Sequence, residues 1–296
     1  MVDYLGKYGY TPDQEAMGRA LEMVAANLES IACEQVYKEC FAMMDLTTLK
    51  TNDTPASVTK LVNKVNDFQL SRPEWPLPAS VCIYPNFASV VKEARRADFN
   101  ITVVSACFPS SQSFLEVKLK ECEMAVEHGA DEVDIVLALN AFLAGDYETA
   151  VEEIRQVRAC IDAVAERQGR HVHLKVILET GLLRTPEAIA NASFLAMEAG
   201  ADFIKTSTGK VDVNATPAAA YVMCECIAKY YAATGKKIGF KPAGGISTAA
   251  DALCYYSIVS TVLGKEWLNK DLFRFGVSRV ANSLLAAVEQ VTVSYF

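Results

Sequence analysis

The sequence predicts a single α/β domain in which eight parallel strands close into a (β/α)8 barrel, the TIM-barrel architecture. Strand-like and helix-like segments alternate along almost the whole chain of 296 residues. The strand-like segments are nearly continuously apolar, as expected for parallel strands covered on both faces. None is followed by G-x-G-x-x-G, the turn typical of an open dinucleotide-binding sheet, so a closed barrel is favoured. The expected strands are residues 41–45, 80–84, 101–106, 132–137, 172–178, 202–206, 238–242 and 272–276.

A further helix is expected before the barrel, at residues 13–33. Its apolar residues recur at helical spacing, so one of its faces is expected to cover the barrel. Residues 1–35 are therefore interpreted as a helical extension of one domain that spans residues 1–296. The proline-rich stretch at residues 72–78 is expected to be a loop, because the chain contains no linker long enough to separate two domains.

Three helices of the barrel are expected to begin with the same signal, a threonine N-cap followed by a proline. Proline is tolerated at the first helical position, because the N–H that it lacks has no partner there in any helix. The recurrence of one start signal indicates repeated strand–helix units. The three pairs are Thr54-Pro55, Thr185-Pro186 and Thr216-Pro217.

Composition excludes several classes of function. The chain has 28 basic and 36 acidic residues, a formal charge of −8, and the two signs are interspersed. This argues against a nucleic-acid or anionic-membrane surface. No apolar run reaches the ~18 residues of a membrane span, and the polar start lacks the apolar stretch of a signal peptide. With nine cysteines and no C-x-x-C pair, we expect reduced thiols and a cytoplasmic location.

Three lysines stand in apolar, strand-like segments, namely Lys175, Lys205 and Lys241. A buried ammonium group loses hydration worth several kcal/mol unless something compensates. Such a lysine is therefore rarely there for packing alone. Asp45 and Asp134 occupy the later parts of two other strands. Because the carboxyl ends of barrel strands converge on one face, these five groups are expected to share a pocket. A surface salt-bridge network is the alternative, which their apolar neighbours disfavour.

The lysines suggest a specific chemistry. Two ammonium groups ~6 Å apart repel by about 3 kcal/mol at an effective dielectric constant near 20, which lowers the pKa of one of them. A neutral lysine can attack a carbonyl and form a Schiff base, an electron sink for breaking or making the adjacent carbon–carbon bond. Asp134 is suited to move protons directly or through a water. These patterns leave open whether Lys205 or Lys241 attacks.

Glycine-rich turns follow the last three expected strands, at residues 208–210, 243–248 and 275–279. Such turns leave backbone N–H groups free to face an anion, and they lead into helices whose N-terminal ends favour negative charge. Loops after the last two strands of this barrel commonly bind phosphate. Next to a lysine centre, they predict a phosphorylated carbonyl substrate.

These segments resemble the deoxyribose-phosphate aldolases, class I (Schiff-base) aldolases with a (β/α)8 barrel. The resemblance covers about residues 40–285. It implies reversible cleavage of 2-deoxy-D-ribose 5-phosphate to D-glyceraldehyde 3-phosphate and acetaldehyde, in the breakdown of deoxyribose phosphates. It is carried mainly by residues 45–49 (DLTTL), 129–134 (GADEVD), 174–181 (LKVILETG), 203–210 (FIKTSTGK) and 239–245 (GFKPAGG).

Transferred to matching positions, the resemblance assigns the Schiff base to Lys205. Lys241 is then the neighbour that lowers the pKa of Lys205, and Asp134 is the main acid–base group, linked to Asp45 and Lys175. Thr47 is implied to hold a substrate hydroxyl. The implied phosphate site consists of Gly209, Lys210, Gly244, Gly245, Gly276 and Ser278.

The chain departs from the family pattern in the phosphate site and at its end. Ser247 and Arg279 are further candidate phosphate-binding residues. Ser247 stands where the family often has arginine, and Arg279 stands where it often has serine. We hypothesise that the guanidinium has moved from one wall of the site to the other; the alternative is that Arg279 lies on a solvent-facing helix. Some members end in a tyrosine that assists proton transfer, which assigns this role to Tyr295, although Phe296 follows it.

Other interpretations remain open at this point. A zinc-dependent aldolase using His171 and His173 is disfavoured, because these residues lie at the start of their strand, away from the expected site. We therefore expect no metal and no cofactor. A non-catalytic sugar-phosphate sensor has no use for a lysine of lowered pKa, and a transaldolase-like enzyme is the catalytic alternative. The expected partners are a sugar phosphate and an aldehyde, with a monomer or a homodimer as the assembly.

Overall fold

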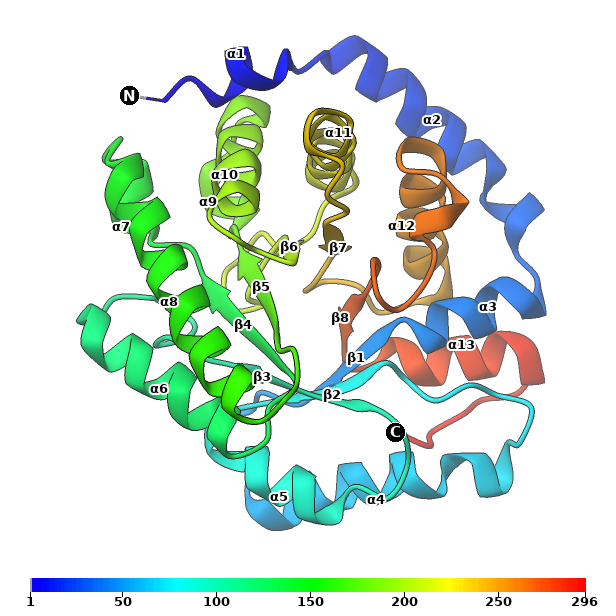
Figure 1. Cartoon of the computed structure of the whole chain (residues 1–296). Helices are drawn as coiled ribbons and strands as arrows, with labels where there is room; N and C mark the ends of the chain where they lie inside the picture. The colour runs from blue at the N-terminus through cyan, green and yellow to red at the C-terminus, as the bar shows by residue number, and fades with distance from the viewer. Residues whose placement is uncertain (1) are drawn as a thin grey trace.

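Eight parallel strands form one sheet in the order β7-β6-β5-β4-β3-β2-β1-β8 (Figure 1). The structure is a computed structural model that describes residues 2–296. The sheet closes on itself, because parallel bridges join Phe240 to Phe273 and Ala243 to Gly276. The predicted (β/α)8 barrel is confirmed. Its strands are β1 (Met44–Thr47), β2 (Ser80–Ile83), β3 (Asn100–Val104), β4 (Glu132–Val136), β5 (His173–Ile177), β6 (Phe203–Lys205), β7 (Gly239–Lys241) and β8 (Phe275–Val277).

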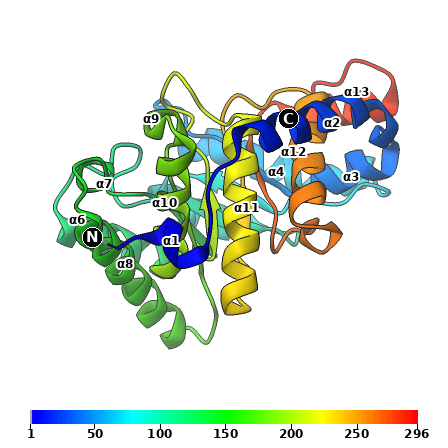
Figure 2. The same ribbon diagram turned by 90° about the horizontal axis from the view of Figure 1, so that it is seen from above.

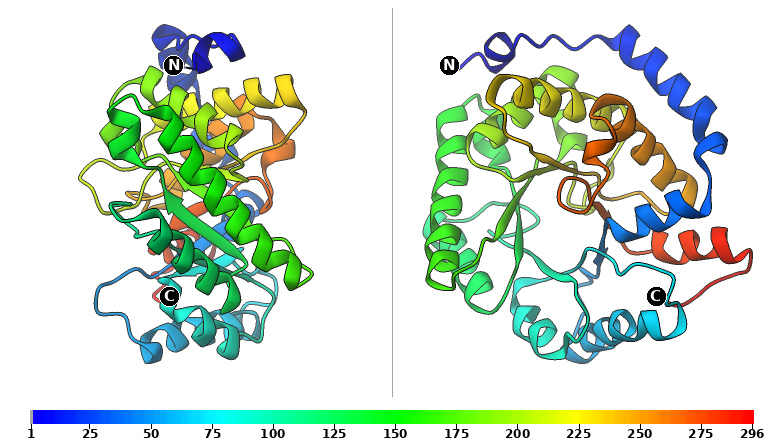
Figure 3. Two further views of the ribbon diagram at one scale, coloured as in Figure 1. Left: turned by 60° about the vertical axis from the view of Figure 1, so that its left-hand side comes forward. Right: turned by 45° about the vertical axis from the view of Figure 1, so that its right-hand side comes forward.

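Helices surround the strands as an outer layer (Figure 3). The three predicted helix starts are confirmed, because the side chains of Thr54, Thr185 and Thr216 each accept a backbone N–H of the first turn. Within residues 2–296, none of the helices has the length and apolar character required to span a bilayer. The outer helices are α4 (Pro55–Ser71), α5 (Ala88–Ala94), α6 (Leu115–Glu127), α7 (Leu139–Leu143), α8 (Tyr147–Arg167), α9 (Thr180–Leu183), α10 (Pro186–Glu198), α11 (Pro217–Thr234), α12 (Ala249–Val262) and α13 (Val280–Glu289).

The N-terminal segment lies on the outside of the barrel. Helix α1 (Tyr4–Tyr8) contacts α10, where Lys7 and Tyr8 both bond the carboxylate of Glu198. Helix α2 (Gln14–Ile31) packs against α11 and α12, as the view from above shows (Figure 2). The predicted helix at residues 13–33 is confirmed, and Asp13 is its N-cap.

The expected first strand at residues 41–45 was wrong at its start. Helix α3 (Glu34–Ala42) continues through Phe41, and β1 begins only at Met44. Phe41 is fully buried, and its ring stacks on Phe68 of α4 with 4.9 Å between the ring centroids. A short apolar run is compatible with a buried helix end and with a buried strand, so periodicity could not place this boundary.

The apolar core lies between the strands and the helices. In α4, Val58, Val62, Val65 and Phe68 are fully buried on the face toward the sheet, and each such side chain contributes about 1.5–3 kcal/mol. The inside of the barrel is different, because it holds ionisable groups where branched apolar side chains are usual. These ionisable groups are almost completely buried, with at most 1% of each exposed. They are Asp45, Glu132, Asp134, Lys175, Lys241 and Arg274.

Candidate active site

The barrel brings the five predicted ionisable groups into one network. Asp134 is paired in register with Lys175 on the next strand, and Lys205 is paired with Lys241. Lys205 and Lys241 are the last residues of β6 and β7. Their side chains therefore point toward the carboxyl end of the barrel interior, next to the neighbours that the sheet register supplies.

Asp134 is the centre of this network. Its Oδ2 atom accepts hydrogen bonds from the Nζ atoms of Lys205 at 2.8 Å and of Lys241 at 2.7 Å. Its Oδ1 atom accepts one from Lys175 at 2.9 Å. Lys241 also forms a close ion pair with Asp45, whereas Asp134 is the only carboxylate among the described residues that pairs with Lys205. One carboxylate thus connects all three lysines.

The three lysines differ in pKa. Burial lowers the pKa of Lys205, the charge of Asp134 opposes this effect, and the charge of Lys241 adds to it, so the pKa is lower than usual. Burial also acts on Lys175 and Lys241, but each faces Asp134 and a second carboxylate, and the pKa of both is raised. The pKa of Asp134 is held well below its usual range, because the three ammonium groups outweigh its burial.

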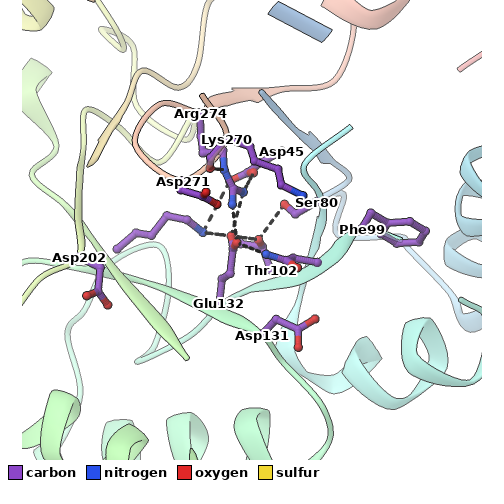
Figure 4. Close-up of polar contacts among 12 residues, drawn as sticks. Asp45, Ser80, Phe99, Thr102, Asp131, Glu132, Asp202, Lys270, Asp271 and Arg274 are labelled. Carbon is purple, nitrogen blue, oxygen red and sulfur yellow. Dashed lines mark hydrogen bonds and ion pairs between the residues drawn. The ribbon is translucent and has the colours of Figure 1, made fainter. Parts of the chain in front are cut away.

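Glu132 and Arg274 extend the network toward the other end of the barrel, and the sequence interpretation missed both (Figure 4). Arg274 donates to Asp45 at 2.6 Å and to Glu132 at 2.7 and 3.1 Å. Glu132 also pairs with Lys175 at 2.6 Å. The sequence signal that could have revealed Glu132 is the alternation along β4. Glu132 and Asp134 are two residues apart, so they point to the same face of the strand.

The network carries an imbalance of charge. Its four cationic side chains are Lys175, Lys205, Lys241 and Arg274, and they face only three carboxylates. With every group ionised the buried cluster has one excess positive charge, which is costly in a medium of low dielectric constant. Loss of the proton from Lys205, the lysine with a lowered pKa, removes this excess.

A cavity of about 280 Å³ borders Lys205 at the carboxyl end of the barrel. Lys205 is 3% exposed, whereas Lys175 and Lys241 are fully buried and do not line the cavity. A substrate carbonyl can therefore reach Lys205 without any rearrangement of the other two. The predicted site residues that line the cavity are Thr47, Lys205, Gly209, Lys210, Gly244, Gly245, Gly276, Ser278 and Arg279.

The glycine turns of the cavity have specific backbone requirements. Gly244 and Gly245 have φ angles of 79° and 80°, which side-chain-bearing residues rarely adopt. Gly276 is needed for close packing, because an added Cβ would lie 2.6 Å from the Cβ of Ala243 on the adjacent loop. Within the described residues, the backbone N–H groups of Gly209, Gly244 and Gly245 donate to no protein acceptor. The cavity thus presents several free donors.

Ser247 is not part of the cavity. Its backbone N–H donates to the Asp251 carboxylate at 2.9 Å, at the N-terminal end of α12. Arg279, by contrast, lines the cavity beside Ser278. Of the two positions at which the chain departs from the resemblance, only Arg279 borders the space where a phosphate is expected.

The sequence matches the family described as "DeoC/LacD family aldolase" over residues 40–255. The chain belongs to this aldolase family. Aldolases are carbon–carbon lyases, so the expected class of enzyme is confirmed.

Relatives of this aldolase cover most of its length. It is 42% identical to the deoxyribose-phosphate aldolase of Homo sapiens over 259 residues, which is 83% of this chain and 77% of the human protein. It is 42% identical to the deoxyribose-phosphate aldolase of Mus musculus over 267 residues, which is 83% of this chain and 77% of the mouse protein. The deoxyribose phosphate aldolase of Aeropyrum pernix has the same fold, with a TM-score of 0.67, 22% identity, and coverage of 93% of this chain and 98% of that one.

The C-terminal tail of the aldolase lies away from the buried network of Lys175, Lys205 and Lys241. The hydroxyl of Tyr295 donates to the carbonyl of Lys64 on α4 at 2.8 Å, and its ring packs edge-on against Phe68. Asn282 holds the tail, because its Oδ1 accepts the backbone N–H groups of Tyr295 and Phe296, both at 2.9 Å. The structure does not bring Tyr295 to the lysine network, and its role in proton transfer stays a prediction.

Proposed function

We propose that the protein cleaves 2-deoxy-D-ribose 5-phosphate reversibly to D-glyceraldehyde 3-phosphate and acetaldehyde through a Schiff base on Lys205. One observation carries this proposal. Of the three lysines in the barrel interior, only Lys205 borders the cavity, and only its pKa is lowered. Membership of the aldolase family supports the reaction type, and the names of the human and mouse relatives support the substrate.

The reaction begins with attack of the neutral Lys205 amine on the C1 aldehyde of the open-chain sugar. Loss of water gives a cationic imine, which draws electrons from the C2–C3 bond. A base removes the proton of the C3 hydroxyl, the C2–C3 bond breaks, and D-glyceraldehyde 3-phosphate leaves. The remaining enamine takes up a proton at its terminal carbon, and water then releases acetaldehyde and restores Lys205.

Asp134 is assigned the proton transfers. Because its pKa is held well below the usual range, it is a carboxylate at neutral pH, and it lies 2.8 Å from the Lys205 nitrogen, within reach of the protons that move at the carbinolamine and enamine stages. Its protonated form would be a strong acid and would return the proton readily, directly or through a water. Lys241 favours the neutral form of Lys205 by its charge, and Asp45 and Lys175 hold the other two groups in position.

The phosphate of the substrate is assigned to the glycine turns after β6, β7 and β8. The unpaired N–H groups of Gly209, Gly244 and Gly245 lie on the same cavity as the cationic side chains of Lys210 and Arg279. This combination is suited to a dianion. Thr47 lines the same cavity and would hold a substrate hydroxyl. A role in deoxyribose phosphate breakdown, a cytoplasmic location and a homodimer remain predictions that depend on this assignment.

Borohydride trapping tests the function. Acetaldehyde and borohydride should convert Lys205 to its N-ethyl derivative, which mass spectrometry of the peptide that carries residue 205 would detect. Lys205→Leu should give no adduct and no release of glyceraldehyde 3-phosphate. Lys241→Leu is the matched control, because it removes the neighbouring lysine and should still be trapped at alkaline pH. An adduct on Lys241, or none in the unmodified enzyme, would overturn the proposal.

A further inference from the structure

Glu179 is a buried acid that the proposed mechanism does not use. It lies two residues after the end of β5, and only 2% of its surface is exposed. Its backbone is left-handed, with φ 54° and ψ 57°, a conformation that costs a residue with a side chain about 1–3 kcal/mol. A strained, buried carboxylate next to the active-site strand requires an explanation.

Both carboxylate oxygens of Glu179 bond to one residue of the neighbouring loop. Oε1 accepts the backbone N–H of Thr208 at 3.2 Å, and Oε2 accepts the hydroxyl of Thr208 at 2.5 Å. The Thr208 hydroxyl oxygen in turn accepts the backbone N–H of Lys210 at 3.1 Å. One carboxylate therefore orders the turn that contains Thr208, Gly209 and Lys210, all of which line the cavity.

The backbone around Glu179 is tied to the strand that carries Lys205. The N–H of Leu178 donates to the carbonyl of Lys205 at 2.9 Å, and the N–H of Thr180 donates to the carbonyl of Thr206 at 2.9 Å. These bonds lie on either side of Glu179. The carboxylate is therefore held at a constant position relative to both Lys205 and the turn at residues 208–210.

Stability alone does not account for Glu179. In the described part of the chain, neither of its oxygens is hydrogen-bonded to a lysine, arginine or histidine, and Thr208 is the partner of both. Burying a carboxylate without a countercharge is unfavourable, and an apolar side chain at this place would avoid the cost. The Glu179 carboxylate instead fixes the geometry of the turn at residues 208–210.

We propose that Glu179 is a positioning residue for the phosphate of the substrate. By occupying the Thr208 N–H and hydroxyl, it holds the turn in the conformation in which the unpaired Gly209 N–H and the Lys210 side chain border the cavity. Without it, the turn must be ordered by the phosphate itself, and the entropy of that ordering is subtracted from binding. This inference rests on the proposed function.

The predicted signature is a change in KM that depends on the phosphate. Glu179→Gln should raise KM for 2-deoxyribose 5-phosphate roughly tenfold, in line with the loss of one charge-assisted hydrogen bond, with kcat within about twofold. Use of unphosphorylated 2-deoxyribose and trapping of acetaldehyde on Lys205 should not change. Thr208→Val removes the partner hydroxyl and should show the same pattern, whereas Thr208→Ser keeps the hydroxyl and should retain the original KM.

Two comparisons separate positioning from general damage. Glu153→Gln is the matched control, because Glu153 is also a largely buried acid, paired with Lys118 on the outer layer at 2.8 Å. It should change thermal stability without changing the preference for the phosphorylated sugar. Equal changes in KM for both sugars, or none for either, in Glu179→Gln and Thr208→Val would overturn the inference. If the unmodified enzyme traps acetaldehyde but does not prefer the phosphorylated sugar, the phosphate assignment fails and the role of Glu179 fails with it.

Discussion

At the scale of single residues, the number of carboxylate partners distinguishes three otherwise similar lysines. Lys205 faces one carboxylate, that of Asp134. Lys241 pairs with Asp45 and Asp134, and Lys175 also has two close carboxylates and a third at 3.6 Å. Since burial lowers the pKa of each, the outcome depends on how much negative charge opposes it. Only Lys205 has too little negative charge beside it to offset the effect of burial on its pKa, so it is suited to be the nucleophile.

The pH dependence of activity follows from this difference. In the proposed mechanism catalysis needs neutral Lys205, so a lowered pKa of this lysine extends activity toward neutral pH. Lys241→Met removes the positive charge that helps to lower it, so the pKa of Lys205 should rise and the acidic limb of the kcat/KM profile should move to higher pH. Activity at neutral pH should fall roughly tenfold or more and recover in part in alkaline buffer.

The matched control for this prediction is Lys237→Met, which removes a lysine just before β7. Lys237 is partly exposed and pairs with Glu266, outside the barrel interior. Its profile should coincide with that of the unmodified enzyme. A pH profile of Lys241→Met whose acidic limb stays in place would contradict the assignment of Lys241, whatever the loss in rate.

At the scale of elements, the loops after β6, β7 and β8 decide what the cavity can bind. They meet because the barrel closes between β7 and β8, where Gly276 lies against Ala243. Ser247 is directed to the carboxylate that caps α12, whereas Arg279 precedes α13 and faces the cavity. The positive charge at the rim therefore comes from Arg279 of the β8–α13 loop, from Lys210 of the β6–α11 loop and from Lys50 of the β1–α4 loop.

Arg279→Ser tests whether this charge serves the phosphate. KM for 2-deoxyribose 5-phosphate should rise about tenfold, the value of one charge-assisted contact to an anion. Use of unphosphorylated 2-deoxyribose should change far less, because the lost partner is absent from that substrate. Ser247→Ala is the control and should leave both sugars unaffected. Steady-state kinetics with the two sugars measures this, and an equal loss for both would exclude Arg279 from the phosphate site.

At the scale of the whole molecule, stability and chemistry occupy different layers. The apolar faces of the outer helices and the outward faces of the strands form the core, while the barrel interior holds the ion network. Buried ion pairs add little net stability, but the removal of one partner is costly. The barrel therefore depends on the network being complete, and Arg274 is the member that joins Asp45 to Glu132.

Arg274→Met should destabilise the protein by about 3–5 kcal/mol, because the buried carboxylates of Asp45 and Glu132 lose the guanidinium that donates to both. Combining it with Glu132→Gln should recover part of this loss, since the second change removes the charge of one of the two carboxylates that lost this partner. Urea unfolding of the single and double variants measures both effects. Arg96→Met, which breaks an exposed pair with Asp67, should have a far smaller effect. A single variant as stable as the original would refute the dependence.

Much of the fold and part of the site could be predicted from local patterns. The alternation of segments predicted the barrel, and the threonine–proline pairs predicted three helix starts. Glycine turns marked the loops that line the cavity. The prediction failed where the pattern was ambiguous, at residues 41–43, and where the role of a residue depends on distant partners. Glu132 shares the inward face of β4 with Asp134, and Arg274 immediately precedes β8, but their importance depends on contacts across the barrel.

The sequence by itself determined the type of fold and the presence of strand-borne lysines, because periodicity and turn chemistry act over a few neighbouring residues. Which of the three lysines has a lowered pKa and borders the cavity was decided only by the tertiary structure. The pKa of Lys205 depends on Asp134, 71 positions away, and Lys241 reaches the same carboxylate across 107 positions. Charges act through distance in space, and only the closed barrel brings both lysine nitrogens within 3 Å of the Asp134 carboxylate.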